Sequence, residues 1–306
     1  MIVSMDWLKD FVSFKLAPQE LADLLTGAGL ESTVGENGDT LDIELTPNRP
    51  DCMSHFGVAR EIALLTDAKL KQTDISLSES DQPVEDAVTI TIEDEKGSPR
   101  YSARVVKGVK VGASPDWMVQ RLEQCGIRSI NSVVDISNYV LLELGHPLHT
   151  FDLGLVEGET IIVRSAKKNE KMVTLDGENR KLSSDHLLIC DSKKPVGLAG
   201  IMGGENTEVT QKTTDVLIEC AYFDPVTIRK GAKKLDLSSE ASRRFERGAD
   251  YDDVTAVLDR TAQLITQIAG GEICAGVVDC YPKVIKPKNV LLNRKRAESS
   301  IGVSFD

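Results

Sequence analysis

The sequence predicts an α+β protein in which a small N-terminal unit of helices and strand is followed by a larger mixed-sheet unit with flanking helices. Alternating apolar and polar residues predict short strands, and apolar residues at helical spacing predict helices between them. Few of these strands are joined by regular helical crossovers, which disfavours a doubly wound parallel sheet. A chain of 306 residues also exceeds what a single core fills efficiently, so at least two compact units are expected.

Residues 1–72 form the predicted N-terminal unit. Ser4 is a suitable cap for a first helix, and Pro18 occupies the first position of a second one. The alternation of residues 41–45 predicts a strand. After a turn-rich stretch, the apolar spacing of residues 58–65 predicts a third helix.

A polar stretch, 73–87, predicts a linker, and residues 88–280 form the larger unit. The basic segment 281–306 begins with a proline-flanked linker and continues into a periodic segment that stops, so we expect it to be the start of a truncated next domain. Within the larger unit, strands are predicted over 88–92, 100–111, 160–164, 172–175, 186–191 and 215–223, and helices beginning at Ser114, near Val133 and near Asp252.

The charge of the chain is uneven. Its formal net charge is −12, and because segment 281–306 carries +4, the first 280 residues carry −16. Such an acidic body disfavours a duplex binder that relies on general phosphate neutralisation, although a local basic patch is compatible with it.

Neither a membrane protein nor a secreted one is expected. No window holds 18 consecutive apolar residues, and the N-terminus lacks a basic start followed by an apolar run. Six cysteines without a C-x2-C pair are typical of reduced thiols. We therefore expect a cytoplasmic protein.

Two features point to a ligand site. Residues 197–205 are rich in glycine, which lets a backbone approach a ligand closely, but a tightly packed strand and turn has the same composition. Glu219 interrupts an apolar strand. If its carboxyl is buried it must be paired or directed at a ligand, whereas alternation alone is equally compatible with a solvent-facing side chain.

Other polar residues allow both structural and functional interpretations. His146 and His149 follow a helix end, but Pro147 between them and the lack of a third ligand disfavour a metal site, and we expect no bound metal. Arg128, at a helix junction, can either hydrogen-bond the carbonyls at a helix end or bind an anion such as phosphate or carboxylate. Segment 237–248 combines hydroxyls with three arginines and is either a capped, charged helix or a phosphate-facing edge.

Ordered motifs extend over nearly the whole chain. They are Leu-Thr-Pro-Asn-Arg-Pro-Asp-Cys at 45–52, Gly-Val-Ala-Arg-Glu at 57–61, Cys-Gly-Ile-Arg-Ser-Ile at 125–130, Val-Val-Asp at 133–135, Asn-Tyr-Val-Leu-Leu-Glu-Leu-Gly at 138–145, His-Thr-Phe-Asp at 149–152, Gly-Gly-Glu at 203–205, Leu-Ile-Glu-Cys-Ala at 217–221, Ser-Glu-Ala-Ser at 239–242 and Phe-Glu-Arg-Gly at 245–248. Together they closely resemble the β subunit of bacterial phenylalanyl-tRNA synthetase.

The resemblance implies an editing module over 88–280 that hydrolyses tyrosine wrongly esterified to tRNA(Phe). A second site that binds the tyrosine hydroxyl is chemically reasonable, because an apolar synthetic pocket rejects an added hydroxyl poorly. The implied substrate-binding residues are Glu219, which recognises the hydroxyl, Gly203 in the pocket wall and Asn138. The implied residues near the ester and the tRNA end are His149, Arg128 and Ser239; no nucleophile is assigned, because a substrate-assisted route through the ribose hydroxyl is equally compatible.

The resemblance also implies tRNA(Phe) and the synthetase α subunit as partners, and no cofactor bound by this chain, since ATP and Mg²⁺ serve the full enzyme. Two departures limit the expectation. The family's oligonucleotide-binding insertion is replaced by a direct connection through residues 36–40, and the C-terminal half is absent, so this chain is not expected to aminoacylate alone. The alternatives are a non-catalytic RNA-binding or subunit-docking piece with an inactive pocket, and a sensor of free amino acids.

Overall fold

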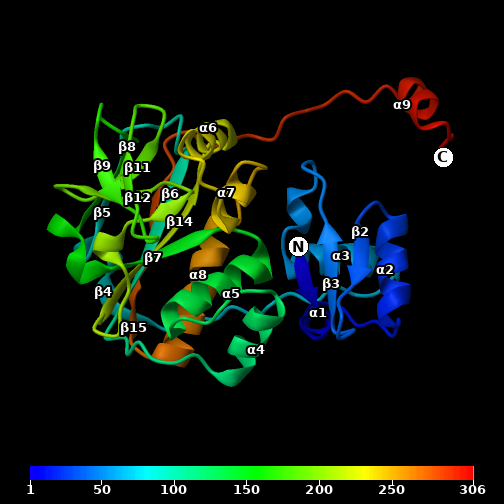
Figure 1. The fold of residues 1–306 in the computed structure, drawn as a ribbon, viewed down its shortest axis with the longest axis horizontal. Coiled ribbons are helices and arrows are strands. Elements are labelled where there is room, and N and C mark those ends of the chain that lie inside the picture. Colours follow the sequence, from blue (N-terminus) through cyan, green and yellow to red (C-terminus); the bar gives the residue numbers. More distant parts are fainter. Residues whose placement is uncertain (306) are drawn as a thin grey trace.

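The N-terminal unit is a three-stranded antiparallel sheet with three helices. The computed structural model describes residues 1–305, and in it this unit lies beside the larger one (Figure 1). The sheet has the order β1-β3-β2. As the sequence predicts, Ser4 caps the first helix by accepting from the Trp7 N–H, and Pro18 opens the second. The elements are β1 (Ile2–Ser4), α1 (Met5–Phe11), α2 (Pro18–Gly27), β2 (Glu31–Val34), β3 (Thr40–Glu44), the 3-10 turn η1 (Pro50–Cys52) and α3 (His55–Leu65).

The Thr-Pro-Asn-Arg-Pro-Asp-Cys motif is a turn held by one arginine. Arg49 forms two hydrogen bonds to Asp51, at 2.9 and 3.0 Å, and an ion pair of 2.8 Å with Glu61. In the described residues Asp51, Cys52 and Glu61 are the one set of three metal-ligand side chains that lie close together. The Arg49 guanidinium already supplies the positive charge there, and burial raises the pKa of the Cys52 thiol to about 12, which disfavours a metal at this point.

The larger unit stacks two sheets. A five-stranded sheet has the order β13-β12-β11-β8-β5, and a six-stranded sheet has the order β4-β15-β6-β14-β7, with β16 also paired to β6. Both contain parallel and antiparallel pairs, so the predicted mixed α+β architecture is confirmed. The strands are β4 (Glu79–Pro83), β5 (Thr89–Ile92), β6 (Arg100–Lys107), β7 (Leu148–Asp152), β8 (Thr160–Ser165), β9 (Lys171–Val173), β10 (Asn179–Lys181), β11 (Leu187–Cys190), β12 (Pro195–Leu198), β13 (Met202–Gly203), β14 (Asp215–Tyr222), β15 (Glu272–Ala275) and β16 (Val278–Cys280).

Helices cover one face of the six-stranded sheet. α8 packs against β14 and β6, and α5 packs against α8 (Figure 1). The other face of this sheet meets the five-stranded sheet through a second apolar core. The helices are α4 (Asp116–Gln124), α5 (Ser132–Leu144), α6 (Pro225–Leu235), α7 (Glu240–Phe245), α8 (Val254–Ala269) and α9 (Arg294–Ile301), with short 3-10 turns η2 (Val84–Asp86), η3 (Leu153–Leu155), η4 (Glu157–Glu159) and η5 (Glu205–Thr207).

Two details differ from the expectations. Ser114 does not cap α4, whose N-cap is Pro115; the Ser114 hydroxyl instead donates to the Asp135 carboxylate. The predicted linker 73–87 contains β4, which pairs with β15, and the buried Val84, so its second half belongs to the larger unit. Polar composition alone did not reveal this edge strand, because four of its five residues are exposed and none of them is a large apolar residue.

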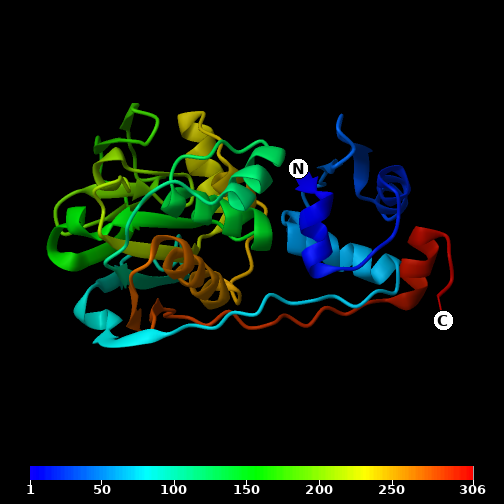
Figure 2. The same ribbon diagram turned by 90° about the horizontal axis from the view of Figure 1, so that it is seen from below.

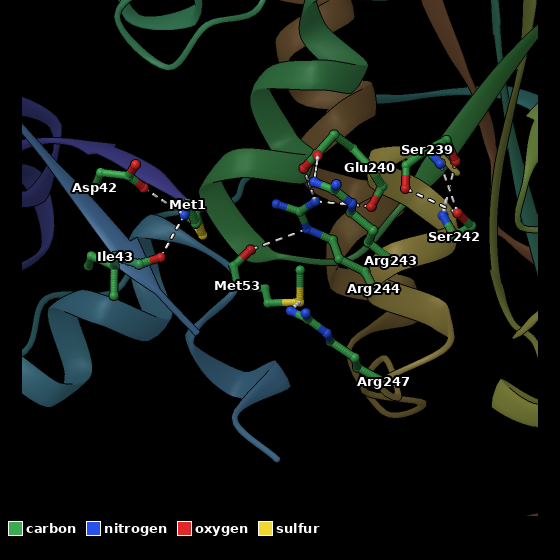
Figure 3. Close-up of polar contacts among 10 residues, drawn as sticks. All are labelled: Met1, Asp42, Ile43, Met53, Ser239, Glu240, Ser242, Arg243, Arg244 and Arg247. Carbon is green, nitrogen blue, oxygen red and sulfur yellow. Dashed lines mark hydrogen bonds and ion pairs between the residues drawn. The ribbon is translucent and has the colours of Figure 1, made fainter. Parts of the chain in front are cut away.

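The two units share one continuous apolar core. At their junction Trp7 stacks on His55, with ring centroids 3.9 Å apart, and on Tyr139 at 4.3 Å. Two arginines from the larger unit complete the contact. Arg244 Nε donates to the Met53 carbonyl at 3.2 Å, and Arg247 approaches the Met53 sulfur (Figure 3).

Beyond β16 the chain leaves the body. Residues 281–293 run out to α9, which stands apart from the sheets in both ribbon views (Figures 1 and 2). No helix within 1–305 is both long and apolar enough to cross a membrane. All six cysteines are unpaired.

His55 couples the units by two hydrogen bonds of opposite sense. Its Nε2 accepts from the Ser4 N–H at 3.0 Å, so its Nδ1–H donates to the Leu142 carbonyl at 2.9 Å. Burial lowers the pKa of His55 to about 3. The junction therefore requires the neutral imidazole, because a proton on Nε2 would remove its acceptor.

Acidification should destabilise the wild-type protein more than a His55→Gln variant. His55 titrates near pH 6.5 when unfolded and near 3 when folded, so its contribution is present above pH 6.5 and is lost as the pH falls towards 3. For one such group the loss is about 2 kcal/mol between pH 7.5 and 5.0. Urea unfolding at both pH values measures it, with His186→Gln as the matched control. Equal pH dependence in wild type and His55→Gln would contradict this assignment.

Candidate active site

A small cavity of about 90 Å³ lies between the two sheets of the larger unit, at the end closed by α7. Its walls are mostly apolar and backbone, and its polar side chains are those of Glu219 and His149. The lining residues come from the start of β7, from β11, from the β12–β13 hairpin, from β14 and from α7: Pro147, Leu148, His149, Ile189, Gly197, Leu198, Gly200, Ile201, Met202, Gly203, Glu219, Ala241 and Phe245.

Glu219 is a buried carboxyl group without a basic partner. It lies in the middle of β14, between β6 and β7, and is 5% exposed. The Tyr101 hydroxyl donates to its Oε2 at 3.0 Å, and no described residue bonds Oε1. Burial raises the pKa of Glu219 to about 8, while the bond from Tyr101 lowers it in part. At neutral pH the group is therefore mostly an uncharged carboxylic acid that can donate and accept hydrogen bonds.

His149 faces the same side of the sheet as Glu219. The two residues are direct partners in the β14–β7 register, and residues opposite each other in a ladder share a face. The Nε2 of His149 is buried and has no hydrogen-bond partner among the described residues. Burial lowers the pKa of His149 to about 4, so the ring is neutral at pH 7 and one of its nitrogens is a free acceptor.

Two glycines of the 197–205 segment are required by close packing. A side chain on Gly203 would begin 2.5 Å from His149 Cε1 and 2.6 Å from His149 Nε2. Gly200 turns the β12–β13 hairpin at a φ of +65°, and a side chain there would begin 3.0 Å from Phe223 and from Phe245. The segment is therefore both a packed hairpin and a wall of the cavity.

Ser239 supports that wall from outside. Its hydroxyl accepts from the Ser242 N–H as the cap of α7 (Figure 3). The same hydroxyl donates to the Ile201 carbonyl at 2.7 Å. Ser239 is not among the cavity-lining residues, whereas Ile201 is. Its hydroxyl is thus engaged in fixing the hairpin to α7.

Arg128 and Asn138 lie outside this cavity. Arg128 is exposed on the connection between α4 and α5, and Asn138 is half-buried on α5. Neither lines the cavity, so the structure brings together Glu219, Gly203 and His149 and leaves these two apart from them. Their assigned roles remain predictions.

Tyr101 is the residue that the sequence reasoning missed. It is the second residue of β6 and is fully buried. With Ala103 and Val105 it forms the apolar half of an alternating strand, so pattern alone marks it as core. In the β6–β14 register Glu219 pairs with Ala103, and Tyr101 lies two residues before Ala103 on the same face. The sequence alone does not give this register, so it could not connect Tyr101 with Glu219. Diagonal neighbours in a sheet lie within reach of an aromatic side chain.

A second, wider cavity of about 470 Å³ lies at the junction of the two units. It combines Arg60 and Arg244 with an acidic loop at Asp250–Asp253, and nothing in it converges on one chemical group. The smaller cavity is the better candidate site, because a few polar groups converge inside apolar walls and two of them have strongly shifted pKa values.

A family model places the chain in a known class of domain. The family model described as "B3/4 domain" matches residues 97–270, more than half of the chain. The chain belongs to the B3/4 domain family.

Among full-length relatives, the similarity is to phenylalanine–tRNA ligase β subunits. That of Geobacter sulfurreducens is 46% identical over 284 residues, covering 93% of this chain and 36% of the relative. That of Rhodopirellula baltica is 42% identical and covers 100% of this chain and 45% of the relative. The chain thus spans less than half the length of these curated relatives.

One solved structure also matches, an N-terminal fragment of the phenylalanyl-tRNA synthetase β subunit from Pyrococcus horikoshii. It is 18% identical, the TM-score is 0.45, and the match covers 100% of this chain and 85% of that one.

Removing the Tyr101 hydroxyl should raise the pKa of Glu219 above its value of about 8. The bond from Tyr101 favours the charged carboxylate, and a Tyr101→Phe variant loses that bond while the burial persists. Carboxyl-carbon NMR titration measures the shift. Tyr222→Phe is the control, because Tyr222 lies on the same strand as Glu219, β14, but forms no hydrogen bond with it. The same pKa in Tyr101→Phe and wild type would contradict the proposed contact.

Proposed function

We propose that this chain is the editing module of a phenylalanine–tRNA ligase β subunit and hydrolyses tyrosine esterified to tRNA(Phe). The observation that carries the proposal is Glu219, a buried carboxyl that lines an apolar cavity. Among the described residues it has no counter-charge, and one of its oxygens is left for a ligand. The relatives named phenylalanine–tRNA ligase β subunit supply the tRNA context.

The cavity supports a selection for the tyrosine hydroxyl. Its apolar walls suit an aromatic ring, and the free Oε1 of Glu219 offers the hydroxyl a hydrogen bond. Phenylalanine in the same place would leave a buried carboxyl oxygen unsatisfied. Sites built around such a bond reject the analogue that lacks it by about 10⁴-fold or more.

The hydrolytic step needs a water and a group to accept its proton. Ester hydrolysis adds one water across the acyl bond and releases tyrosine and tRNA. Neutral His149 lines the cavity, and its buried Nε2 has no partner among the described residues, which supports a role as that acceptor. The ribose hydroxyl of the substrate is the other candidate. Ser239 supports the site by fixing the β12–β13 hairpin to α7. Arg128 is exposed outside the cavity, where its proposed role is contact with the tRNA end.

The proposal extends to the partners. tRNA(Phe) is the substrate, and the name of the relatives, beta subunit, implies a companion subunit with which the longer proteins assemble. The ester hydrolysis itself consumes water alone, so no cofactor bound by this chain is proposed; ATP and Mg²⁺ belong to aminoacylation by the full ligase.

Deacylation of Tyr-tRNA(Phe) and Phe-tRNA(Phe) tests the proposal. Wild type should release tyrosine selectively. Glu219→Ala should lose the selectivity, whereas Glu219→Gln, which still accepts from Tyr101 and offers an N–H donor, should keep part of it at pH 7. Glu208→Ala is the control, because Glu208 is exposed and outside the cavity. If wild type binds tRNA(Phe) but releases no tyrosine, the non-catalytic alternative replaces this proposal.

A single methyl group on Gly203 should abolish most of the activity. In Gly203→Ala the new carbon would overlap the His149 ring, which must shift. Displacing a catalytic group by about 1 Å costs on the order of 10²-fold in rate. Gly27→Ala is the matched control, because its side chain meets open space. Single-turnover deacylation is the readout, and an unimpaired Gly203→Ala enzyme would remove His149 from the mechanism.

A further inference from the structure

Helix α6 carries a basic face in an acidic protein. Its eleven residues contain Arg229, Lys230, Lys233 and Lys234 and no Asp or Glu, while the whole chain has a net charge of −12. All four basic side chains are exposed. They follow a helical spacing of three and four, so they lie along one side of the helix.

The opposite side of α6 packs on the wall of the candidate active site. The side chain of Ile228 reaches the Gly200 backbone, since a side chain on Gly200 would begin 3.0 Å from Ile228 Cδ1. Gly231 lies against Ile201, because a side chain on Gly231 would begin 3.4 Å from Ile201 Cδ1. Gly200 and Ile201 both line the cavity, so α6 is one layer of side chains away from it, beside α7 (Figure 1).

Three of the four cations have no carboxylate partner among the described residues. Lys234 pairs with Asp185 at 2.6 Å, but Arg229, Lys230 and Lys233 form no ion pair. The helix dipole favours cations in the last turn and so accounts for Lys233 and Lys234. It does not account for Arg229 and Lys230, which lie in the middle of the helix.

We infer that the basic face of α6 binds the phosphate backbone of the tRNA 3′ strand while the esterified amino acid occupies the cavity. The inference rests on the proposed function. A cavity of about 90 Å³ accommodates no more than an amino-acid side chain, so the nucleotides must lie outside it. On a body of net negative charge, a cluster of unpaired cations on the outer face of the helix that covers the cavity wall is a surface that attracts a polyanion.

Charge reversal on α6 tests the inference. Arg229→Glu combined with Lys233→Glu should weaken binding of uncharged tRNA(Phe) by about tenfold or more at 50 mM salt. It should also reduce the slope of log affinity against log salt by about 2, one for each lost phosphate contact. Fluorescence anisotropy of labelled tRNA between 50 and 200 mM salt gives both values. The alanine pair, Arg229→Ala with Lys233→Ala, should act in the same direction with a smaller effect.

The matched control is Lys286→Glu with Lys288→Glu, which changes the net charge equally on the segment that leads to α9. It should alter the affinity by less than about twofold. Equal losses of tRNA affinity in the two charge-reversed double variants would show a general charge effect. No loss of affinity in the α6 variant would mean that the RNA binds elsewhere, or that α6 binds an acidic protein instead. Either result overturns the inference. The failure of each proposal has its own signature. Binding of tRNA through α6 without any deacylation would overturn the proposed function alone. Unchanged tRNA affinity together with normal deacylation in the α6 variants would overturn the docking surface alone.

Discussion

The candidate site depends on one energetic constraint, the burial of the Glu219 carboxyl in the middle of a sheet. An isolated buried charge costs several kcal/mol in a real protein, so the group is retained either by a cation or by holding its proton. No cation is bonded to it in the described structure, and Tyr101 offers a hydroxyl in place of a guanidinium. Strand β14 makes this possible, because β6 and β7 on its two sides remove solvent from both edges.

The same constraint sets the character of the cavity. Burial raises the pKa of Glu219 to about 8 and lowers that of His149 to about 4, so two facing titratable residues are both uncharged between these values. Two neutral groups with free hydrogen-bonding positions suit an uncharged phenol and an ester better than they suit an ion. An arginine beside Glu219 would have bound the carboxylate itself and left nothing for a ligand.

Much of this arrangement was predictable from local pattern, and the rest required the strand register. Glycine density indicated a close backbone approach at 197–205, and the interruption of an apolar strand singled out Glu219. Tyr101 was hidden because a buried tyrosine looks like any core residue until β6 is aligned with β14. Arg128 was grouped with the site by resemblance alone, and the structure places it on an exposed connection outside the cavity. The periodicity of a strand predicts on which face of the sheet a residue lies, but not which residue of a distant strand lies beside it on that face.

The N-terminal unit has a direct path to the site through the end of α5. His55 bonds the Leu142 carbonyl one turn before Gly145, and a side chain on Gly145 would begin 3.0 Å from Ser54. Gly145 ends α5 at a φ of +83°, and β7 starts at Leu148, one residue before His149. The turn that positions His149 is therefore packed against the other unit. Only the neutral form of His55 fits at the junction, and His149 in the cavity is neutral as well. The junction and the cavity therefore depend on the same condition, a histidine that burial keeps uncharged.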